Sequence, residues 1–248
     1  MVPALRSAPS APPAHEVTPS VALAVALVAY NTLTNVTRAD DRRWYVTRHS
    51  VVGVLLLTAA RHRGLTWDEL GLAPAGLRAA WRHGLPVAVA VAGGVMVAAA
   101  LGRRRTVGRR LLTDRRADVG DRELAWQALV RIPVGTAAFE EVAFRGVLYA
   151  LLARSAGTPA ALAGSSVAFG LWHIGPTLAA LRHNDAAGRP AGPVTGAVAA
   201  TMVAGLALAG LRAAADHLVP CWLAHWASNA VGLTLAARWQ RRAGAVPA

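Results

Sequence analysis

The sequence predicts an all-α protein, a polytopic bundle of transmembrane helices with about seven spans, within a range of six to eight. Three observations support this fold class. Of the 248 residues, 54% are hydrophobic and the mean hydropathy is +0.38, whereas soluble domains are usually less apolar. The apolar residues gather in separate blocks, and most arginines lie between the blocks. This combination indicates helices that cross a membrane repeatedly.

The apolar blocks define the expected elements in order along the chain. They cover residues 20–36, 46–60, 84–101, 126–152, 158–174, 194–213 and 218–236. Several blocks are shorter than the roughly 20 residues that a full span prefers, and many are rich in Ala and Gly, which is why the expected count has a range. The blocks divide the chain into a disordered N-terminal tail (1–19), N-terminal spans (20–124), a candidate catalytic domain (125–237) and a basic C-terminal tail (238–248).

The basic residues indicate topology. The formal net charge is +13, and all 26 basic residues are arginines. Seventeen of them lie in the connections 37–48, 102–124 and 175–193 and after residue 236, against seven in the alternate connections. A nucleic-acid-binding protein gathers its charge on one surface, so this spread predicts a lipid bilayer and no nucleic acid as partner. The positive-inside rule places the arginine-rich connections and the C-terminus in the cytoplasm. The Ala- and Arg-rich, Lys-free composition indicates a bacterial cell membrane.

Two connections have features of their own. In residues 64–82, Thr66 and Glu69 have capping-box spacing, which predicts a short helix lying at the membrane interface. A substrate gate is the functional alternative for this segment. In residues 175–193, Gly175 and Pro176 are expected to end the preceding helix and to begin a polar loop.

Three ionisable residues interrupt the apolar stretch 134–152, namely Glu140, Glu141 and Arg145. Such groups cost several kcal/mol in a membrane helix unless they are paired or face a wet cavity. Glu141 and Arg145 are four residues apart and can pair on one helix face. Glu140 is rotated by about 100° from Glu141 and has no obvious local partner, so it is the candidate general base or metal ligand. The structural alternative is an ion-pair cluster between helices.

Two later apolar blocks contribute further polar side chains. His173 ends one block, and His225 and Asn229 share a helix face in the last block. An asparagine facing lipid would leave its amide unsatisfied, so the pair is a candidate for metal binding or for donating hydrogen bonds to an oxyanion. A histidine in hydrogen-bonded core packing is the alternative for His173. Trp172 is expected at the membrane interface.

The three motifs together resemble those of a known family. They read Glu140-Glu141-x-x-x-Arg145, Phe169-x-x-x-His173 and His225-x-x-x-Asn229, a pattern similar to that of the CAAX-protease and bacteriocin-processing (CPBP, Abi) family of intramembrane proteases. The resemblance implies an endopeptidase that acts on membrane-tethered peptides or proteins, of CAAX or bacteriocin type. It implies that Glu140 and His173 activate water, that His225 and Asn229 stabilise the oxyanion or help to hold a metal, and that Glu141 and Arg145 fix the geometry.

Two questions stay open at this point. The usual zinc-protease signature His-Glu-x-x-His is absent from the sequence, but Glu140, His173 and His225 could form a His₂Glu site for Zn²⁺. The sequence therefore leaves a metal requirement undecided. A catalytically silent scaffold or immunity protein and a proton-relay transporter are the alternative functions.

Overall fold

The computed structural model describes residues 14–37, 44–104 and 112–244, and the regular structure of these residues is entirely helical. The main helices are α1 (Ala14–Thr37), α2 (Tyr45–His62), α3 (Leu77–Gly102), α5 (Asp121–Trp126), α6 (Tyr149–Trp172), α7 (Ile174–His183), α8 (Ala191–Ala215) and α9 (Leu218–Gly244). Two π-helical segments, η3 (Gln127–Ala138) and η4 (Glu141–Leu148), join α5 to α6, and two 3₁₀ turns, η1 (Pro74–Gly76) and η2 (Arg115–Ala117), precede α3 and α5. The predicted all-α class is confirmed.

Each of the seven apolar blocks lies in a helix. The block 126–152 is part of one continuous helical run that begins with α5, passes through η3 and η4 and enters α6. Gly157 divides α6 at the end of this run, because its φ of 82° lies in the left-handed region that residues with a Cβ rarely adopt. Residues 158–172 therefore form a separate arm, and the break falls between two predicted blocks.

The helices extend into both predicted tails. Helix α1 begins at Ala14 and α9 continues to Gly244, so residues 14–19 and 238–244 are helical rather than tail-like. The rest of the expected tails, residues 1–13 and 245–248, lies outside the described residues, as does part of the arginine-rich run (105–111).

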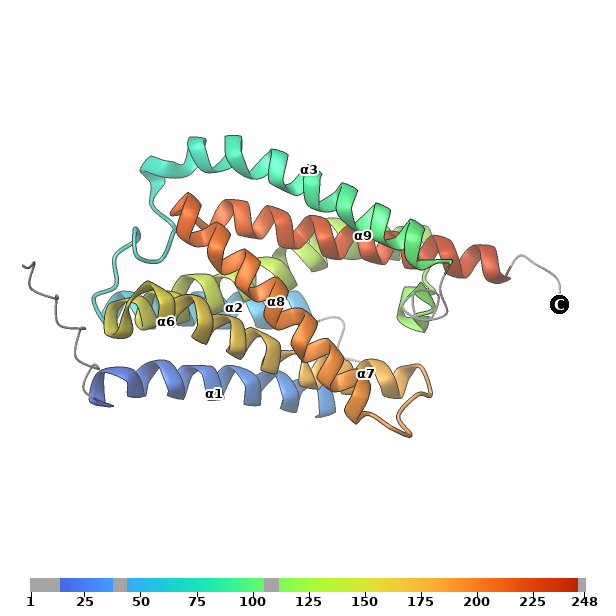
Figure 1. Ribbon diagram of the computed structural model, residues 1–248, viewed down its shortest axis with the longest axis horizontal. Coiled ribbons are helices and arrows are strands. Elements are labelled where there is room, and N and C mark those ends of the chain that lie inside the picture. The colour runs from blue at the N-terminus through green and yellow to red at the C-terminus, as the bar shows by residue number, and fades with distance from the viewer. Residues whose placement is uncertain (1–13, 38–43, 105–111, 245–248) are drawn as a thin grey trace, which may run out of the picture.

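The connections alternate between the two ends of the bundle (Figure 1). At one end, the backbone N–H of Arg115 donates to Asn184 Oδ1 (2.9 Å), which joins the connection before α5 to the one after α7. At the other end, Arg154 pairs with Glu69 (2.6 Å), which joins the connection after α2 to the break within α6. The arginine-rich connections thus share one end, and the arginine-poor connections share the other.

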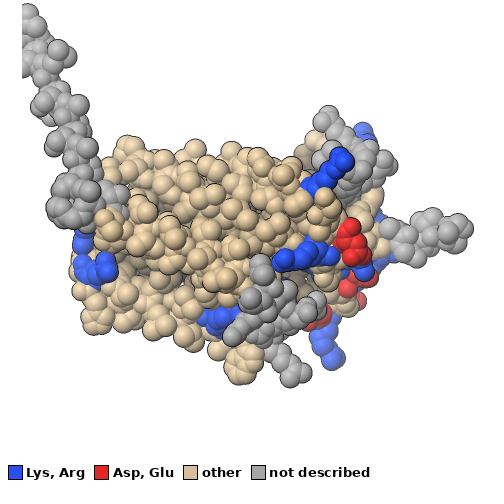
Figure 2. Space-filling view, turned by 90° about the horizontal axis from the view of Figure 1, so that it is seen from below, with Lys and Arg blue, Asp and Glu red and all other residues tan. Residues whose placement is uncertain are grey.

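The outer surface is apolar where helices face away from the bundle. Val89 on α3 and Val203 on α8 are each 72% exposed, and Figure 2 shows a broad uncharged area on one face with acidic side chains at one end. Two helical segments of the described chain, Pro74–Gly102 and Ala191–Ala215, are long and apolar enough to cross a membrane. The predicted count of about seven spans is therefore not confirmed by helix length and composition.

The interior is built around the motif-bearing helical run. Phe144 on η4 packs edge-on against Phe169 and Trp172 of α6, with ring centroids 5.3 and 5.4 Å apart. Helix α8 closes this core through Gly205, where an added Cβ would lie 3.2 Å from the Phe169 ring and from Ser166 Cα. The small residue lets α8 approach α6 closely, which is typical of helix packing in membranes.

The segment before α3 forms a turn anchored by two buried leucines instead of the predicted interfacial helix. The capping-box bonds are present, since Thr66 N donates to Glu69 Oε2 (2.7 Å) and Glu69 N donates to Thr66 Oγ1 (3.2 Å). However, a single turn forms and ends at Gly71, whose φ is 70°. Leu65 and Leu70 are fully buried, whereas Thr66, Trp67 and Asp68 between them are exposed, so the turn lies on the surface with its two leucines in the core.

The connection 175–193 is also shorter than predicted. Helix α6 ends at Trp172, and α7 begins at Ile174, so the chain turns at His173 and not at Gly175-Pro176. Gly175 packs against α1, where an added Cβ would lie 2.8 Å from Thr32 Cα. Proline is tolerated in the first turn of a helix, which is why Pro176 does not stop α7.

Candidate active site

Glu140 and Glu141 lie where two π-helical segments meet. Phe139 and Glu140 form a short α-helical step between η3 and η4. A π-turn contains i→i+5 hydrogen bonds, and such turns are frequent at functional sites. Each inserted residue rotates the following side chains by about 100° relative to a regular α-helix. The directions of the Glu140 and Glu141 side chains therefore depend on the π-turns and cannot be predicted from α-helical spacing alone.

The predicted pair of Glu141 and Arg145 is present and buried. Arg145 Nη1 lies 3.2 Å from Glu141 Oε1, and the two side chains are 0% and 1% exposed. Arg145 Nη2 also donates to the backbone carbonyl of Gly205 (3.2 Å), and the guanidinium lies 4.0 Å from the centre of the Phe169 ring. Losing one partner of a buried pair is strongly destabilising, so this pair fixes η4 against α6 and α8.

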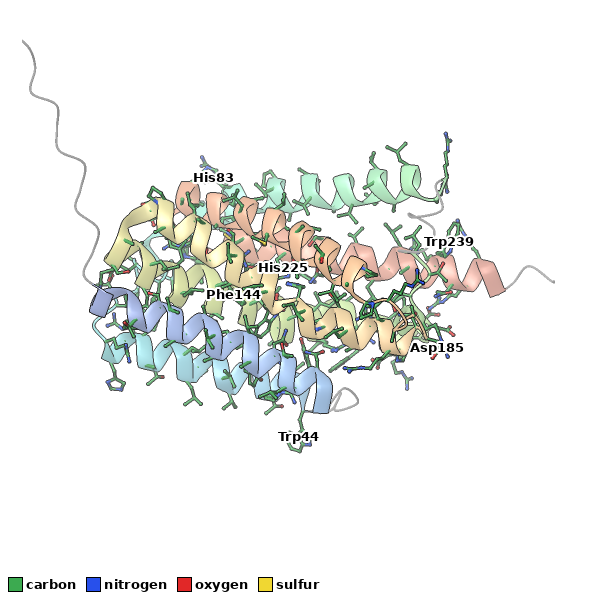
Figure 3. The ribbon with its side chains drawn as sticks, turned by 60° about the horizontal axis from the view of Figure 1, so that its bottom comes forward. Trp44, His83, Phe144, Asp185, His225 and Trp239 are labelled. Carbon is green, nitrogen blue, oxygen red and sulfur yellow. The ribbon has the colours of Figure 1, made fainter. Side chains whose placement is uncertain are left out.

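His225 lies between the two carboxylates. Its Nδ1–H donates to Glu141 Oε1 (2.7 Å), and its Nε2 lies 3.7 Å from Glu140 Oε2. The hydrogen bond from Nδ1 fixes the ring orientation and leaves Nε2 directed at Glu140. His225 is 6% exposed, and Figure 3 shows it in the middle of the bundle, as it does Phe144.

Glu140 has a partner that the sequence analysis missed. Trp172 Nε1 donates to Glu140 Oε1 (3.1 Å), and Asn31 Nδ2 of α1 donates to the backbone carbonyl of Trp172 (2.8 Å). Trp172 is 2% exposed, so its predicted place at the membrane interface is wrong. The one feature of the sequence that could have indicated a role for Trp172 in the site was its position next to His173. Glu140 Oε2 is buried without a hydrogen-bond partner in the described part of the chain.

His173 and Asn229 lie beside this cluster rather than in it. His173 Nδ1 donates to the carbonyl of Phe169 (2.8 Å), and the Phe169 ring contacts the rings of both His173 and His225, with centroid distances of 4.8 and 5.9 Å. Asn229 has a long contact with Ser228 Oγ (3.4 Å). Among the described residues, no hydrogen bond joins His173 or Asn229 to Glu140 or Glu141.

The candidate metal ligands do not gather into a site. Across residues 14–37, 44–104 and 112–244, no group of three or more His, Cys, Asp or Glu side chains is arranged to hold a metal ion. Glu140 and His225 approach each other at 3.7 Å, whereas the Nδ1 of His173 is bound to the backbone carbonyl of Phe169. The residues therefore do not fit the His₂Glu zinc site, and no reaction step is derived through a metal.

A cleft lies at the arginine-rich end of the bundle. It has a volume of about 960 Å³ and lies among α3, η3, α7 and α9. Asn229 and Thr136 are among the residues that line it, and Thr136 precedes Glu140 by four residues, or about one helical turn. Glu140, Glu141 and His225 do not line the cleft; Thr136 and Asn229 are the lining residues nearest in sequence to Glu140 and His225.

Comparison with known proteins agrees with the motif pattern. Residues 122–231 match the family model described as "Rce1-like: Type II CAAX prenyl endopeptidase Rce1-like". The matched segment contains all three motifs, so the resemblance drawn from them is confirmed. No curated protein and no solved structure matches the chain.

Proposed function

From the premise that residues 122–231 are a domain of the type II CAAX prenyl endopeptidase family, whose members are hydrolases embedded in membranes, we propose that this chain is an intramembrane endopeptidase. The observation that carries the proposal is the buried group formed by Glu140, Glu141 and His225. A purely structural ion-pair cluster would satisfy both carboxylates, whereas Glu140 Oε2 and Glu141 Oε2 are both buried without a hydrogen-bond partner among the described residues, and Glu140 Oε2 is the one that His225 Nε2 faces at 3.7 Å.

The proposed nucleophile is a water held by Glu140 Oε2 and His225 Nε2. The 3.7 Å between these atoms is longer than a direct hydrogen bond, and we place the water beside this pair of atoms, within hydrogen-bond reach of both. Because Nδ1 of His225 donates to Glu141, Nε2 of the neutral ring accepts a hydrogen bond from the water. Glu140 then acts as the general base. This geometry favours His225 over His173 as the partner of Glu140.

The reaction balances with these residues alone. Glu140 takes a proton from the water as its oxygen attacks the peptide carbonyl carbon, and the carbonyl electron pair moves onto oxygen. The side-chain amide of Asn229, on the cleft wall, donates to that oxyanion. When the tetrahedral intermediate collapses, the C–N bond breaks and Glu140 returns the proton to the leaving nitrogen, which yields one carboxylic acid and one amine. His173 lies at the entrance to this group and contacts the bound chain.

The membrane setting follows from the alternation of the connections. We take the seven apolar blocks to cross the membrane in turn, which puts the arginine-rich connections on one side, and by the positive-inside rule this side is the cytoplasm. The cleft lies at the same end, so a membrane-tethered chain enters it from the cytoplasm of the bacterial cell. The CAAX-like or bacteriocin-type substrates that the resemblance implies fit this route.

The test is cleavage of quenched-fluorescent peptides by the full chain in detergent. We expect the unmodified protein to cleave, and Glu140→Gln to lose at least a hundredfold in kcat while keeping its thermal unfolding temperature. Arg122→Gln, an exposed change on α5, is the control and should leave the rate unchanged. Cleavage that survives Glu140→Gln would exclude Glu140 as the base and would end this proposal.

A further inference from the structure

Arg131 is a charged residue in the apolar part of η3 that has no acidic partner within residues 14–37, 44–104 and 112–244. Its Nη1 donates to Gln127 Oε1 at a long 3.3 Å, and its guanidinium lies 4.5 Å from the centre of the Tyr45 ring. Its Nε is buried and has no hydrogen-bond partner among the described residues. An arginine has five N–H donors, and an intramembrane arginine usually pairs or lines a wet cavity. Arg131 lines the cleft.

The neighbours of Arg131 hold it in place without neutralising it. Gln127 Nε2 donates to Glu123 Oε1 (2.8 Å), which orients the amide that contacts Arg131. The hydroxyls of Tyr45 and Thr136 are 3.1 Å apart and hydrogen-bonded, so the ring under the guanidinium is fixed as well. A cation ordered in advance loses less entropy when it binds an anion.

The cleft has more cations than anions available for a ligand. Asp114 is the one acidic residue among the described residues that line it, and Arg116 binds it through Nε (2.9 Å) and Nη2 (2.6 Å). Arg182 on α7 lines the same cleft and makes no side-chain hydrogen bond or ion pair within the described chain. The guanidinium groups of Arg131 and Arg182 are thus both free to bind an anion.

The spacing along η3 relates Arg131 to the proposed nucleophile. Arg131 precedes Glu140 by nine positions, a separation along the axis of at most about 13 Å, because the π-helical segment rises less per residue than the roughly 1.5 Å of an α-helix. An extended peptide covers about 3.3–3.6 Å per residue, so the same distance corresponds to about four residues of a bound chain. A guanidinium binds a carboxylate with two parallel hydrogen bonds.

From these observations we infer that Arg131, with Arg182 beside it in the cleft, binds a carboxylate of the substrate about four residues from the bond that is cut. The inference rests on the proposed function for the identity of the ligand as a peptide. The carboxylate has two possible sources, the free C-terminus of the peptide or an acidic side chain, and the chemistry that Arg131 recognises is the same for both. Arg131 is thus a residue that determines substrate specificity.

The test measures binding apart from cleavage. The full chain with Glu140→Gln is titrated against a fluorescein-labelled apolar decapeptide in three forms, and anisotropy gives the Kd. The first form has a free C-terminal carboxylate, the second a C-terminal amide, and the third a C-terminal amide with one Asp four residues from the end. We expect at least one of the acidic forms to bind about tenfold more tightly than the plain amide, and the stronger one identifies the source.

The variants assign the effect to Arg131. Adding Arg131→Gln should reduce the tenfold ratio of Kd values between the amide and acidic peptides to about one. Arg131→Lys should keep part of this ratio, because the charge remains but the two parallel hydrogen bonds of the guanidinium are lost. The matched control is Arg122→Gln, which removes the same charge from the adjoining helix α5 at an exposed position and should keep the preference.

Three outcomes would overturn the inference: equal Kd values for all three peptides, a preference that persists in Arg131→Gln, or a lack of binding by any form. If the acidic preference depends on Arg131 but the unmodified chain cuts none of the peptides, the inference stands and the proposed endopeptidase activity fails. The two ideas are therefore tested separately.

Discussion

Replacing Trp172 by Phe removes one hydrogen bond to the proposed general base and keeps the aromatic packing around it. The indole Nε1 donates to Glu140 Oε1 at 3.1 Å inside the core, and a hydrogen bond to a charged group contributes about 1.5–3 kcal/mol. If Glu140 is held for catalysis by this bond, kcat should fall by about tenfold to 150-fold. KM should change little, because Trp172 is buried and does not line the cleft.

The matched control for this variant is Trp226→Phe. Trp226 Nε1 donates to the backbone carbonyl of Ala128 (2.7 Å), so the control loses a similar indole hydrogen bond, but the acceptor lies twelve residues before Glu140. Steady-state kinetics with one peptide, together with thermal unfolding of both variants, separate loss of rate from loss of fold. An unchanged kcat in Trp172→Phe, or an equal fall in Trp226→Phe, would refute the view that Trp172 positions the base.

Three further predictions concern stability. Glu141→Gln should destabilise the fold by about 3–5 kcal/mol, measured by chemical unfolding, because it leaves the buried Arg145 charge unpaired; a variant as stable as the parent would contradict the burial of this pair. Gly71→Ala should lower the free energy of unfolding by more than Gly64→Ala. Both glycines have a positive φ, which costs a residue with a Cβ about 1–2 kcal/mol. A Cβ at Gly71 would also lie 2.5 Å from the buried guanidinium of Arg212, whereas nothing lies within 4 Å of a Cβ at Gly64. The backbone N–H of Thr66, followed by the Arg154 side chain, holds the pKa of Glu69 below its usual value of 4.5. A carboxyl whose pKa is lower in the folded state stabilises the fold above its unfolded pKa, and this stabilisation is lost as the pH falls. The thermal unfolding temperature should therefore fall as the pH drops below about 4.5, and Glu69→Gln should flatten that dependence.

Much of the fold could be predicted because membrane helices are specified locally. An apolar block must satisfy its backbone hydrogen bonds internally, so it forms a helix wherever it lies. The seven blocks therefore correspond to helices, and Gly157 separates two of them by its backbone conformation. The helix expected at the membrane interface around Thr66 did not form. Its capping bonds formed, but burial of Leu65 and Leu70 in the core kept the segment as a single turn.

The candidate site could be predicted in part. The pairing of Glu141 with Arg145 follows from a four-residue spacing within one helix, and the structure contains it. The contact between Glu141 and His225 joins residues 84 positions apart, and no local sequence pattern predicts which of the two carboxylates binds the imidazole. The hydrogen bond from Trp172 to Glu140 was not predicted, because a tryptophan near the end of an apolar helix is usually expected at the membrane interface, and the sequence does not show that Trp172 is buried.

The sequence by itself determined the helical class, the alternation of arginine-rich connections and the residue types available for hydrolysis, since hydropathy, charge and short spacings are properties of neighbouring residues. Only the tertiary structure decided how those residues combine. It placed His225 between the two acids, left Glu140 Oε2 without a hydrogen-bond partner in the described chain, bound His173 Nδ1 to the carbonyl of Phe169, and turned Arg131 toward the cleft. These relations depend on the π-helical turns and on close helix packing at Gly205. Both set the directions of side chains across helices, which the order of residues along one helix does not determine.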